Sequence, residues 1–311
     1  MTAKQDRSGL DLMTVSNSID GKICMVTGAT SGIGMVTARQ LAQRGASVVI
    51  VSRNSEKCTA TVEQIKDQTG NQQVDYLVAD LSSQDQIRHM VSEFHQSYDR
   101  LDVLLNNAGG IFLSRRESED GIEMTWALNH LNYFMLTNLL LHTLLSSSEP
   151  GKASRIVNVA SAAHRGARIK FDDLQAENRY SGMQAYGQSK LANVLFTYEL
   201  DRRLAKAGVD DRVSVNALHP GFVSTNLVGD NSWLVRLAMR FIYFFAGKRP
   251  EQGAETSVYS ASSPEVEGVS GKYFVDCEPV QTAPLSYDEN IAERLWEVSA
   301  EMTGLEAEIS H

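Results

Sequence analysis

Short, almost continuously apolar runs alternate along this chain with longer stretches in which apolar residues recur every three or four positions. Such runs, rich in β-branched residues, are typical of strands buried on both faces of a parallel sheet. The alternation predicts right-handed βαβ units and therefore an α/β fold with a doubly wound parallel sheet. Strands are expected at residues 23–28, 47–53, 74–80, 101–107, 155–161, 213–220 and 272–276, and helices near 33–44, 83–98, 119–145, 186–207, 232–245 and 250–262.

No linker or internal repeat divides the chain. Its 311 residues, 42% of them hydrophobic, are enough to bury one large core. We expect a single catalytic domain over residues 21–285, a flexible N-terminal arm over 1–20 and a C-terminal helix or tail over 286–311. The arm lacks the apolar core of a secretory signal. The longest apolar run, 125–145, contains polar residues that would be costly in a bilayer, so we expect a cytoplasmic protein.

The net charge and the cysteine spacing argue against nucleic acid and metal ions as ligands. The formal net charge of −9 argues against nucleic acid, whose binding needs a clustered basic surface. Cys24, Cys58 and Cys277 are widely spaced and match no metal-ligand pattern. They predict free thiols in a reducing compartment, with neither a disulfide nor a metal site. We therefore expect a small-molecule ligand and no nucleic acid.

The stretch TGATSGIG (27–34) follows the first expected strand and opens the next helix. Glycines there let the backbone pass close to a pyrophosphate held by the helix N-terminus. The alternative is a tight turn without a ligand, since the glycine spacing differs from the commoner G-x-G-x-x-G. We interpret the stretch as a dinucleotide-binding loop. Its expected contact residues are Gly28, Thr30, Ser31, Gly32, Ile33 and Gly34.

Residues after the second and third strands bear on the choice between NADP and NAD. Arg53, followed by Asn54, can pair with the 2′-phosphate of NADP, whereas a carboxylate there would bind the ribose hydroxyls of NAD. Arg53 could instead be an ordinary solvated arginine. Asp80 and Leu81 are expected to flank the adenine, although Asp80 could equally cap the helix that starts near Ser82. We expect NADP(H) in preference to NAD(H).

The fourth and fifth strands also end in polar and glycine-rich stretches. NNAGG (106–110) allows a sharp bend, and we expect Asn107, Ala108 and Gly109 to face the cofactor. VNVASAAH (157–164) leaves the Ser161 hydroxyl where it could reach a carbonyl oxygen. Ser161 could instead start an acyl-transfer triad with a histidine, but no G-x-S-x-G elbow surrounds it. The sequence therefore favours carbonyl chemistry over hydrolysis.

The stretch AYGQSKLAN (185–193) places Tyr186 and Lys190 four positions apart in an expected helix. This spacing puts both side chains on one face. A phenol with a pKa near 10 is a poor proton donor at neutral pH, but a nearby cation favours the phenolate and lowers that pKa. The pair alone is weak evidence, since the spacing also arises by chance. At the ligand-binding edge of a sheet it has a chemical purpose, namely general acid–base catalysis.

Together TGATSGIG, NNAGG, VASAAH, YGQSK and HPGFVST, in this order and spacing, resemble the classical short-chain dehydrogenase/reductase family over about residues 20–280. The resemblance implies a Rossmann-type single domain and a catalytic tetrad of Asn129, Ser161, Tyr186 and Lys190. In it the serine would donate a hydrogen bond to the substrate oxygen, the tyrosine would supply a proton, the lysine would lower the tyrosine pKa and hold the ribose, and Asn129 would hold a water.

The resemblance also implies that HPGFVST (219–225) lies against the nicotinamide end of the cofactor. Asn129 has an alternative interpretation, because a buried asparagine can simply satisfy backbone groups. The helices at 125–145 and 186–207 are the surfaces by which family members usually pair, so a homodimer or tetramer is expected. The contact residues expected in HPGFVST are Pro220, Gly221, Val223 and Thr225.

Three stretches are most similar to the retinol-dehydrogenase-like group of that family: VASAAH (159–164), HPGFVSTNL (219–227) and RPEQGAETSVYSASSPEVEGVSGKYFVDC (249–277). This similarity implies an NADP(H)-dependent oxidoreductase acting on a bulky hydrophobic carbonyl or alcohol, such as retinal or retinol, a steroid or a long-chain aldehyde. Residues 226–250 are rich in apolar side chains and are expected to form a substrate lid. Core or dimer packing is a second interpretation. Arg236 and Arg240 suggest a third, in which residues 232–249 contact a membrane surface.

Three other functions are compatible with parts of the sequence. A protochlorophyllide-type reductase would use the same Tyr/Lys pair, but such enzymes resemble YxxSKxCN, and this chain has Ala192 at the cysteine position. A sensor would bind NADP(H) without turnover, although such proteins usually lose the tyrosine or the lysine. A membrane-attached scaffold would keep only the fold. The retained pair favours the enzyme.

Overall fold

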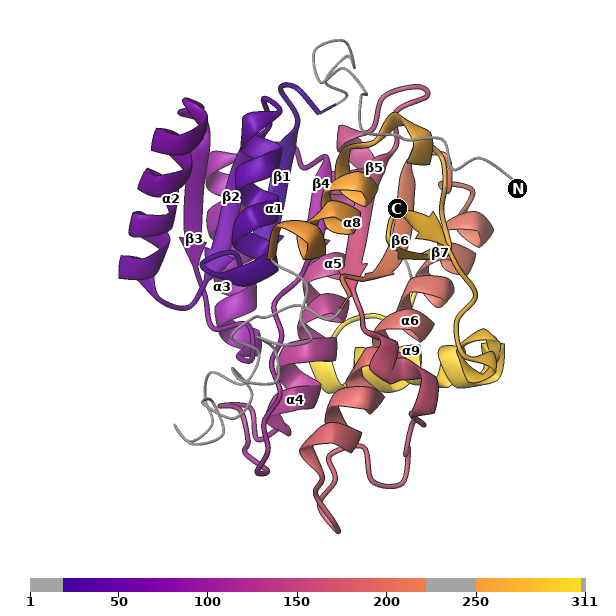
Figure 1. Cartoon of the computed structure of the whole chain (residues 1–311). Coiled ribbons are helices and arrows are strands. Elements are labelled where there is room, and N and C mark those ends of the chain that lie inside the picture. Colours follow the sequence, from indigo (N-terminus) through magenta and orange to yellow (C-terminus); the bar gives the residue numbers. More distant parts are fainter. Residues whose placement is uncertain (1–18, 222–249, 309–311) are drawn as a thin grey trace, which may run out of the picture.

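The computed structural model describes residues 19–221 and 250–308 and shows one sheet with helices on both faces (Figure 1). The strand order is β3-β2-β1-β4-β5-β6-β7-β8, with β8 (Glu278–Pro279) antiparallel to β7 and the other pairs parallel. This order confirms the predicted doubly wound α/β fold. The parallel strands are β1 (Ile23–Thr27), β2 (Ser47–Ser52), β3 (Val74–Val78), β4 (Val103–Asn106), β5 (Ser154–Val159), β6 (Val213–His219) and β7 (Lys272–Val275).

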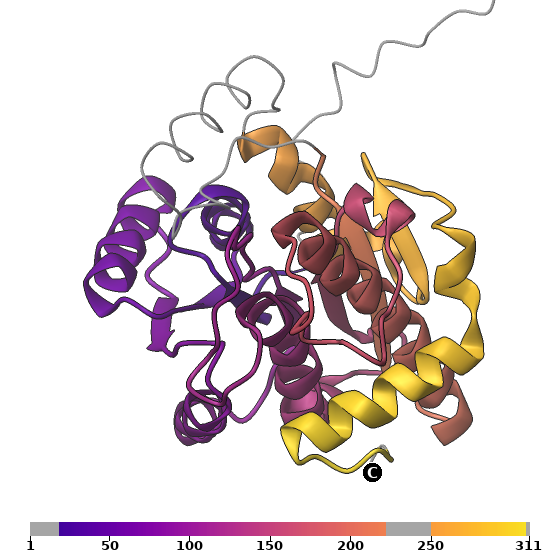
Figure 2. The ribbon, with the colours of Figure 1, turned by 90° about the horizontal axis from the view of Figure 1, so that it is seen from below.

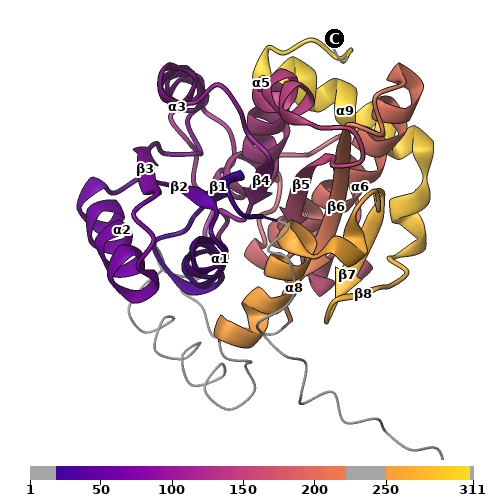
Figure 3. The same cartoon turned by 90° about the horizontal axis from the view of Figure 1, so that it is seen from above.

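Two layers of helices cover the sheet (Figure 3). On one face α1, α2 and α8 pack against β1, β2 and their neighbours, and on the other lie α3, α5 and α6. Their bounds are α1 (Gly32–Gln43), α2 (Ser55–Thr69), α3 (Gln84–Ser97), α4 (Met124–Trp126), α5 (Asn132–Ser147), α6 (Gly182–Ala207), α8 (Pro250–Ser262) and α9 (Glu289–Thr303). In the part of the chain described, no helix has both the length and the apolar content to cross a membrane.

Several helices depart from the sequence prediction. Helix α2 was not predicted, because most of its residues are polar and its buried stripe is limited to Cys58, Thr61, Val62 and Ile65. Helix α6 starts at Gly182, four residues before the expected start, with Ser181 as its N-cap. The helix expected at 119–145 starts only at Met124, because Glu123 pairs with Glu117 in an isolated β-bridge. The helix expected at 232–245 lies outside the described residues.

Helix α9 lies across α5 and α6 on the outside of the molecule (Figure 2). Its Trp296 is fully buried, stacks on Phe196 of α6 with ring centroids 5.7 Å apart and meets Phe134 of α5 edge-on at 4.9 Å. The Arg203 guanidinium lies over the same indole, at 4.5 Å from its centroid. Part of the helix surface that the family resemblance assigns to subunit pairing is thus covered within the chain.

His130 is fully buried where α6, α9 and the π-helical turn η1 (Ala127–Leu131) meet. Its ring nitrogens lie 3.3 Å from Asn193 Oδ1 and 2.9 Å from Ser299 Oγ. Burial lowers the pKa of His130 to about 3, from 6.5 for an unperturbed imidazole. The unfolded chain therefore binds more protons than the folded chain between about pH 6.5 and pH 3, so stability falls as the pH drops through this window.

We predict that the free energy of unfolding falls by up to about 1.4 kcal/mol per pH unit below pH 6.5 because of this one histidine. Urea unfolding at pH 7, 6 and 5 measures the slope. His130→Gln removes the titrating group and should flatten it, whereas His89→Gln, at an exposed position of α3, should not. An unchanged slope in His130→Gln would show that other groups cause the acid sensitivity.

Candidate active site

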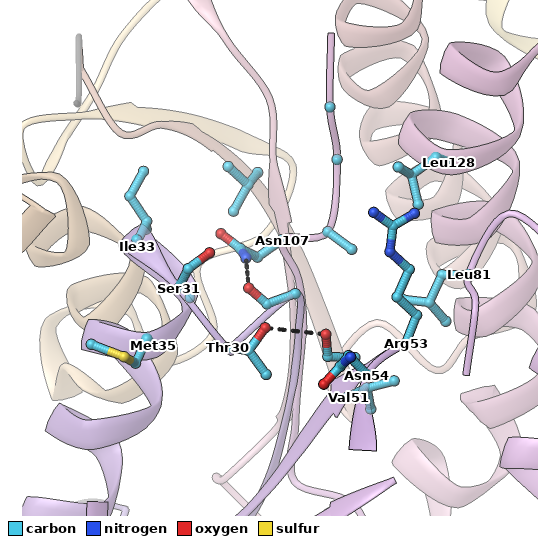
Figure 4. A pocket seen from close by; sticks show the side chains of 18 of the residues that line it. Thr30, Ser31, Ile33, Met35, Val51, Arg53, Asn54, Leu81, Asn107 and Leu128 are labelled. Atoms are coloured by element: carbon cyan, nitrogen blue, oxygen red, sulfur yellow. Dashed lines mark hydrogen bonds between the residues drawn. The ribbon is translucent and has the colours of Figure 1, made fainter. Parts of the chain in front are cut away.

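A cavity of about 770 Å³ opens at the carboxyl ends of the first five strands and is bounded by α6 (Figure 4). This is the sheet edge at which doubly wound folds bind ligands. A cavity of this volume lies in the range of cofactor and substrate sites. The lining includes these residues expected from the sequence: Gly28, Thr30, Ser31, Gly32, Ile33, Gly34, Arg53, Asn54, Asp80, Leu81, Asn107, Ala108, Gly109, Tyr186, Lys190 and Pro220.

The glycine loop is pressed against the end of β4. A Cβ on Gly28, which has a φ of +66°, would lie 2.9 Å from Ala108 Cα, and one on Gly34 would lie 2.5 Å from Asn107 Nδ2. The Asn107 side chain donates to the Thr27 carbonyl at 2.8 Å and locks the two strand ends together. Side chains at the glycine positions are therefore excluded by packing alone. The loop backbone is thereby held close to the end of β4 at the N-terminus of α1, and helix N-termini bind phosphates readily.

The end of β2 and the first turn of α2 each contribute a cation to the cavity. Arg53 extends beside Leu81 toward Leu128 (Figure 4). Asn54 caps α2 by accepting the Lys57 N–H at 2.8 Å, and Lys57 itself also lines the cavity. Sequence reasoning missed Lys57 because it missed α2. The signal was present, since residues 58, 61, 62 and 65 carry a helical spacing of apolar and small side chains that starts four residues after a capping asparagine.

Asp80 closes the turn between β3 and α3. Its Oδ1 accepts from the Ser82 N–H at 3.0 Å and from the Ser82 hydroxyl at 2.7 Å, while its own N–H donates to Gln86 Oε1 at 2.9 Å. These bonds shape the turn before α3 but do not cap the helix, whose N-cap is Ser83. Asp80 and Leu81 both line the cavity, which is compatible with their expected place beside the adenine.

Tyr186 and Lys190 lie together on the buried face of α6. The Lys190 Nζ lies 5.7 Å from the centroid of the Tyr186 ring and donates to the Val159 carbonyl at 2.9 Å. Burial lowers the pKa of Lys190 to about 7 from 10.5. The hydroxyl of Tyr133, which the sequence analysis did not single out, donates to the same carbonyl at 3.4 Å. The end of β5 thus fixes the lysine head beside the tyrosine.

Ser161 lies at the start of the short 3₁₀ helix η2 (Ala162–Gly166), just after β5. It is the N-cap of that helix, and its Oγ accepts from the Ala163 N–H at 3.3 Å. Ala163 packs with Ile111 against the Tyr186 ring, which brings the serine turn next to the tyrosine. The His164 Nδ1 lies 2.7 Å from the Ser161 main-chain oxygen, not from its hydroxyl. The hydrolase alternative therefore lacks its base at this position.

Asn129 is fully buried within η1, and both ends of its side chain are hydrogen-bonded. Its Oδ1 accepts from the Gly110 N–H at 2.8 Å, and its Nδ2 donates to the Gly110 carbonyl at 3.0 Å and to Ser189 Oγ at 3.1 Å. Its main-chain oxygen accepts from Asn193 Nδ2 at 2.9 Å. Asn129 therefore holds the glycine bend after β4, as in the alternative interpretation that it satisfies backbone groups.

The sixth strand delivers Pro220 to the cavity rim, and Gly221 follows with a φ of +83°. Val223, Thr225, residues 226–249 of the expected lid (226–250) and the apolar stretch 232–249 lie outside the described residues; Pro250 begins α8. Residues 19–221 and 250–308 contain no group of three His, Cys, Asp or Glu side chains arranged to hold a metal ion. In the described part of the cavity, the phenol of Tyr186 and the amine of Lys190 lie together at one end.

Comparison with known proteins agrees with this geometry. The family model of short chain dehydrogenases matches residues 22–233. Human polyprenol dehydrogenase is 42% identical over 284 residues, which cover 91% of this chain and 86% of the relative. Human retinol dehydrogenase 11 is 42% identical over 307 residues, which cover 98% of this chain and 93% of the relative.

Solved structures share the fold. A crystal structure titled as a putative uncharacterized protein from Mycobacterium paratuberculosis superposes with a TM-score of 0.75 at 33% identity, covering 94% of this chain and 97% of that one. The Pseudomonas aeruginosa RhlG/NADP active-site complex superposes with a TM-score of 0.66 at 26% identity, covering 84% and 97%. The chain belongs to the short-chain dehydrogenase family and, within it, to the retinol-dehydrogenase-like group of oxidoreductases.

Proposed function

We propose that the protein is an NADP(H)-dependent oxidoreductase that interconverts a bulky hydrophobic carbonyl compound and its alcohol. The observation that carries the proposal is the Tyr186/Lys190 pair, buried on one helix face at the end of a dinucleotide-sized cavity. No metal is needed for such a reaction, because hydride and proton transfer can be shared between a nicotinamide and a general acid. Human polyprenol and retinol dehydrogenases, by their names, act on alcohols with long apolar skeletons.

Each side chain has a defined task in the proposed reaction. Ser161 donates a hydrogen bond to the substrate oxygen, and Tyr186 gives that oxygen a proton during carbonyl reduction. The Lys190 ammonium stabilises the phenolate that remains, from its fixed place on the Val159 carbonyl. Asn129 keeps the bend at Gly110 in place beneath the cofactor site. In alcohol oxidation the same groups act in reverse, with the phenolate as the base.

The residues present fit a dinucleotide. Gly28 and Gly34 let the loop backbone pack against Ala108 and Asn107 next to the N-terminus of α1, where the pyrophosphate would be held. Lys190 and Asn107 would lie at the ribose and nicotinamide end, with Pro220 at the rim. When bound, NADP(H) supplies or accepts the hydride. Val223 and Thr225 are also proposed to contact the cofactor at this end.

The preference for NADP(H) rests on charge at the adenosine end. Arg53 and Lys57 both line the cavity there, and the one carboxylate of the lining, Asp80, is bonded to Ser82. Two cations suit a 2′-phosphate, whereas NAD offers only hydroxyls to this surface. The RhlG structure holds NADP in the same fold.

Arg53→Ala should therefore raise the KM for NADPH by about 10- to 100-fold and leave the KM for NADH nearly unchanged, because only the phosphate contact is lost. Initial rates with both cofactors measure the change. Arg39→Ala is the control, since Arg39 contacts Gln68 and Glu251 away from the cavity. Equal effects on both cofactors, or a wild-type preference for NADH, would contradict the proposed role of Arg53.

The substrate end of the cavity is apolar. Ile111 packs against Tyr186, and Phe112 and Met124 also line the cavity, which favours a hydrophobic ligand over a sugar or an acid. The test is to follow reduced-nicotinamide absorbance with NADPH and NADH against retinal, long-chain polyisoprenoid aldehydes, steroid ketones and small quinones. Turnover of the bulky apolar compounds is expected. Tight NADPH binding with no turnover of any carbonyl would instead support the sensor function.

The proposed setting of the enzyme is the cytoplasm, where its three cysteines would stay as the free thiols observed. Peripheral contact with a membrane through residues 232–249 is part of the proposal, because the arginines and apolar residues of that stretch suit an anionic lipid surface. Pairing into a homodimer or tetramer would have to use surface other than the part of α5 and α6 that Trp296 covers.

A further inference from the structure

His164 joins the turn that carries Ser161 to a distant part of the chain. Its main-chain N–H donates to the Ser161 carbonyl at 3.1 Å, and its ring Nδ1 lies 2.7 Å from the same oxygen. On the other side of the ring, Nε2 accepts the Ala283 N–H at 3.2 Å. The side chain is fully buried. One imidazole therefore bridges the residue after β5 and the segment that precedes α9.

The two main-chain partners fix the protonation state of the ring, and the Tyr273 hydroxyl, 3.5 Å from Nδ1, can accept from it as well. A carbonyl oxygen can only accept a hydrogen bond and a main-chain N–H can only donate one. Nδ1 must therefore carry the proton and Nε2 must be bare, which is the neutral Nδ1–H tautomer. Burial lowers the pKa of His164, partly offset by its bond to the Ser161 carbonyl, and so favours this neutral form.

Other contacts tie the same two segments together. The Tyr273 ring of β7 packs against the imidazole with centroids 5.0 Å apart, and Arg165 donates to the Gln281 carbonyl at 2.8 Å. Helix α6 leaves little space on its side, since a Cβ on Gly187 would lie 3.2 Å from the Ala163 carbonyl. The serine turn is thus clamped between α6, β7 and residues 281–283.

We propose that His164 is a positioning residue for the reaction: its Nδ1–H holds the Ser161 carbonyl while its Nε2 is anchored on Ala283, so that residues 281–283 complete the serine side of the active site. The inference rests on the proposed function, in which the Ser161 hydroxyl contacts the substrate oxygen. The main-chain position of Ser161 sets where that hydroxyl points, and an error of 1 Å in a catalytic group can cost about 10²-fold in rate.

Two isosteric variants separate the two contacts of the ring. The amide nitrogen of asparagine falls where Nδ1 lies, so His164→Asn keeps the donor to Ser161. The amide of glutamine reaches the place of Nε2, so His164→Gln keeps only the Ala283 side, and His164→Leu keeps neither. We expect kcat to fall by about 10- to 100-fold in the leucine and glutamine variants, and by a smaller factor in the asparagine variant, which keeps the Ser161 contact but loses the Ala283 anchor. The Kd of NADPH, followed by its fluorescence, should be the same in all three.

A merely structural role predicts a different pattern. In that case kcat, cofactor affinity and Tm would fall together, and asparagine would rescue no better than glutamine, which would overturn the proposal. Wild-type kcat in His164→Leu, with Ser161→Ala inactive, would overturn the proposal while sparing the proposed function. Wild-type turnover in Ser161→Ala would remove the serine from the mechanism and this inference with it.

A measurement on the unmodified protein keeps the proposal testable if a variant does not fold. With ¹⁵N-labelled histidine, NMR distinguishes the Nδ1–H from the Nε2–H tautomer of a neutral ring. We expect a neutral Nδ1–H signal near pH 7 that is absent from the spectrum of His164→Asn. An Nε2–H signal assigned to His164 would overturn the proposal.

Discussion

Tyr186→Phe is expected to lower kcat by about 10²-fold or more, because the variant has no proton to give to the substrate oxygen and general acid catalysis is worth at least that factor. The aromatic ring stays, so the apolar contacts with Ile111 and Ala163 are kept. The Kd of NADPH should change little. Single-turnover kinetics under saturating cofactor measure the chemical step directly.

The control is Tyr259→Phe, which removes a hydroxyl from α8 that donates to Glu265 at 3.1 Å. Tyr259 does not line the cavity, so its variant should keep wild-type turnover. Tyr186→Phe with unchanged kcat would refute the proposed proton transfer. Loss of NADPH binding in that variant would show that the hydroxyl holds the cofactor instead.

Lys190→Met should abolish most of the activity and at the same time stabilise the fold. The variant loses the cation beside Tyr186, and kcat should fall by about 10²-fold or more because the phenolate is no longer stabilised. Burial lowers the pKa of Lys190 to about 7 from 10.5, so near neutral pH folding has to desolvate or deprotonate this amine. Methionine removes that cost, and the Tyr133 hydroxyl still donates to the Val159 carbonyl.

The expected gain in the free energy of unfolding at pH 7 is about 1–4 kcal/mol. Between pH 7 and about pH 10 the unfolded wild-type chain binds more protons at this lysine than the folded chain, so wild-type stability should rise with pH. The rise due to Lys190 should be absent from the methionine variant. Urea unfolding at pH 7 and pH 9 measures both effects.

Lys206→Met serves as the matched control, because Lys206 is exposed near the end of the same helix. It should change neither kcat nor the pH dependence of stability. Full turnover in Lys190→Met would remove the lysine from the proposed mechanism. A loss of stability in that variant would show that the buried ammonium contributes more to the fold than its desolvation costs.

The strands were predictable because a parallel sheet buried on both faces imposes apolar residues at nearly every position. β1 to β7 were each predicted to within three residues at either end. Helix α2 was missed for the opposite reason: it covers the rim of the sheet with one narrow stripe, and its other residues face solvent. The early start of α6 was missed because a glycine is needed at position 182 for close packing against the chain at Phe112, not for helix formation. A Cβ there would lie 2.3 Å from the Phe112 carbonyl, which periodicity cannot show.

Within the site, the local spacing of residues predicted which side chains lie together, whereas the tertiary contacts could not be predicted from the sequence. The helix period alone places Tyr186 and Lys190 on one face, as observed. The bonds of Asn129 to Gly110 and Ser189 join residues 19 and 60 positions away, and no local pattern encodes them. The same holds for the contact between His164 and Ala283, which are 119 positions apart. From the sequence, a histidine near Ser161 suggested only the general base of an acyl-transfer triad.

The distance of Ala283 from His164 along the chain also bears on how the protein is synthesised. The glycine loop and Arg53 belong to β1 and β2 and leave the ribosome early, and multi-element chains begin to fold from that end. The turn around Ser161 meets its partner segment only after most of the polypeptide has been made. A message truncated after α6 would therefore encode both Tyr186 and Lys190 and still yield a chain with nothing for the serine turn to close against.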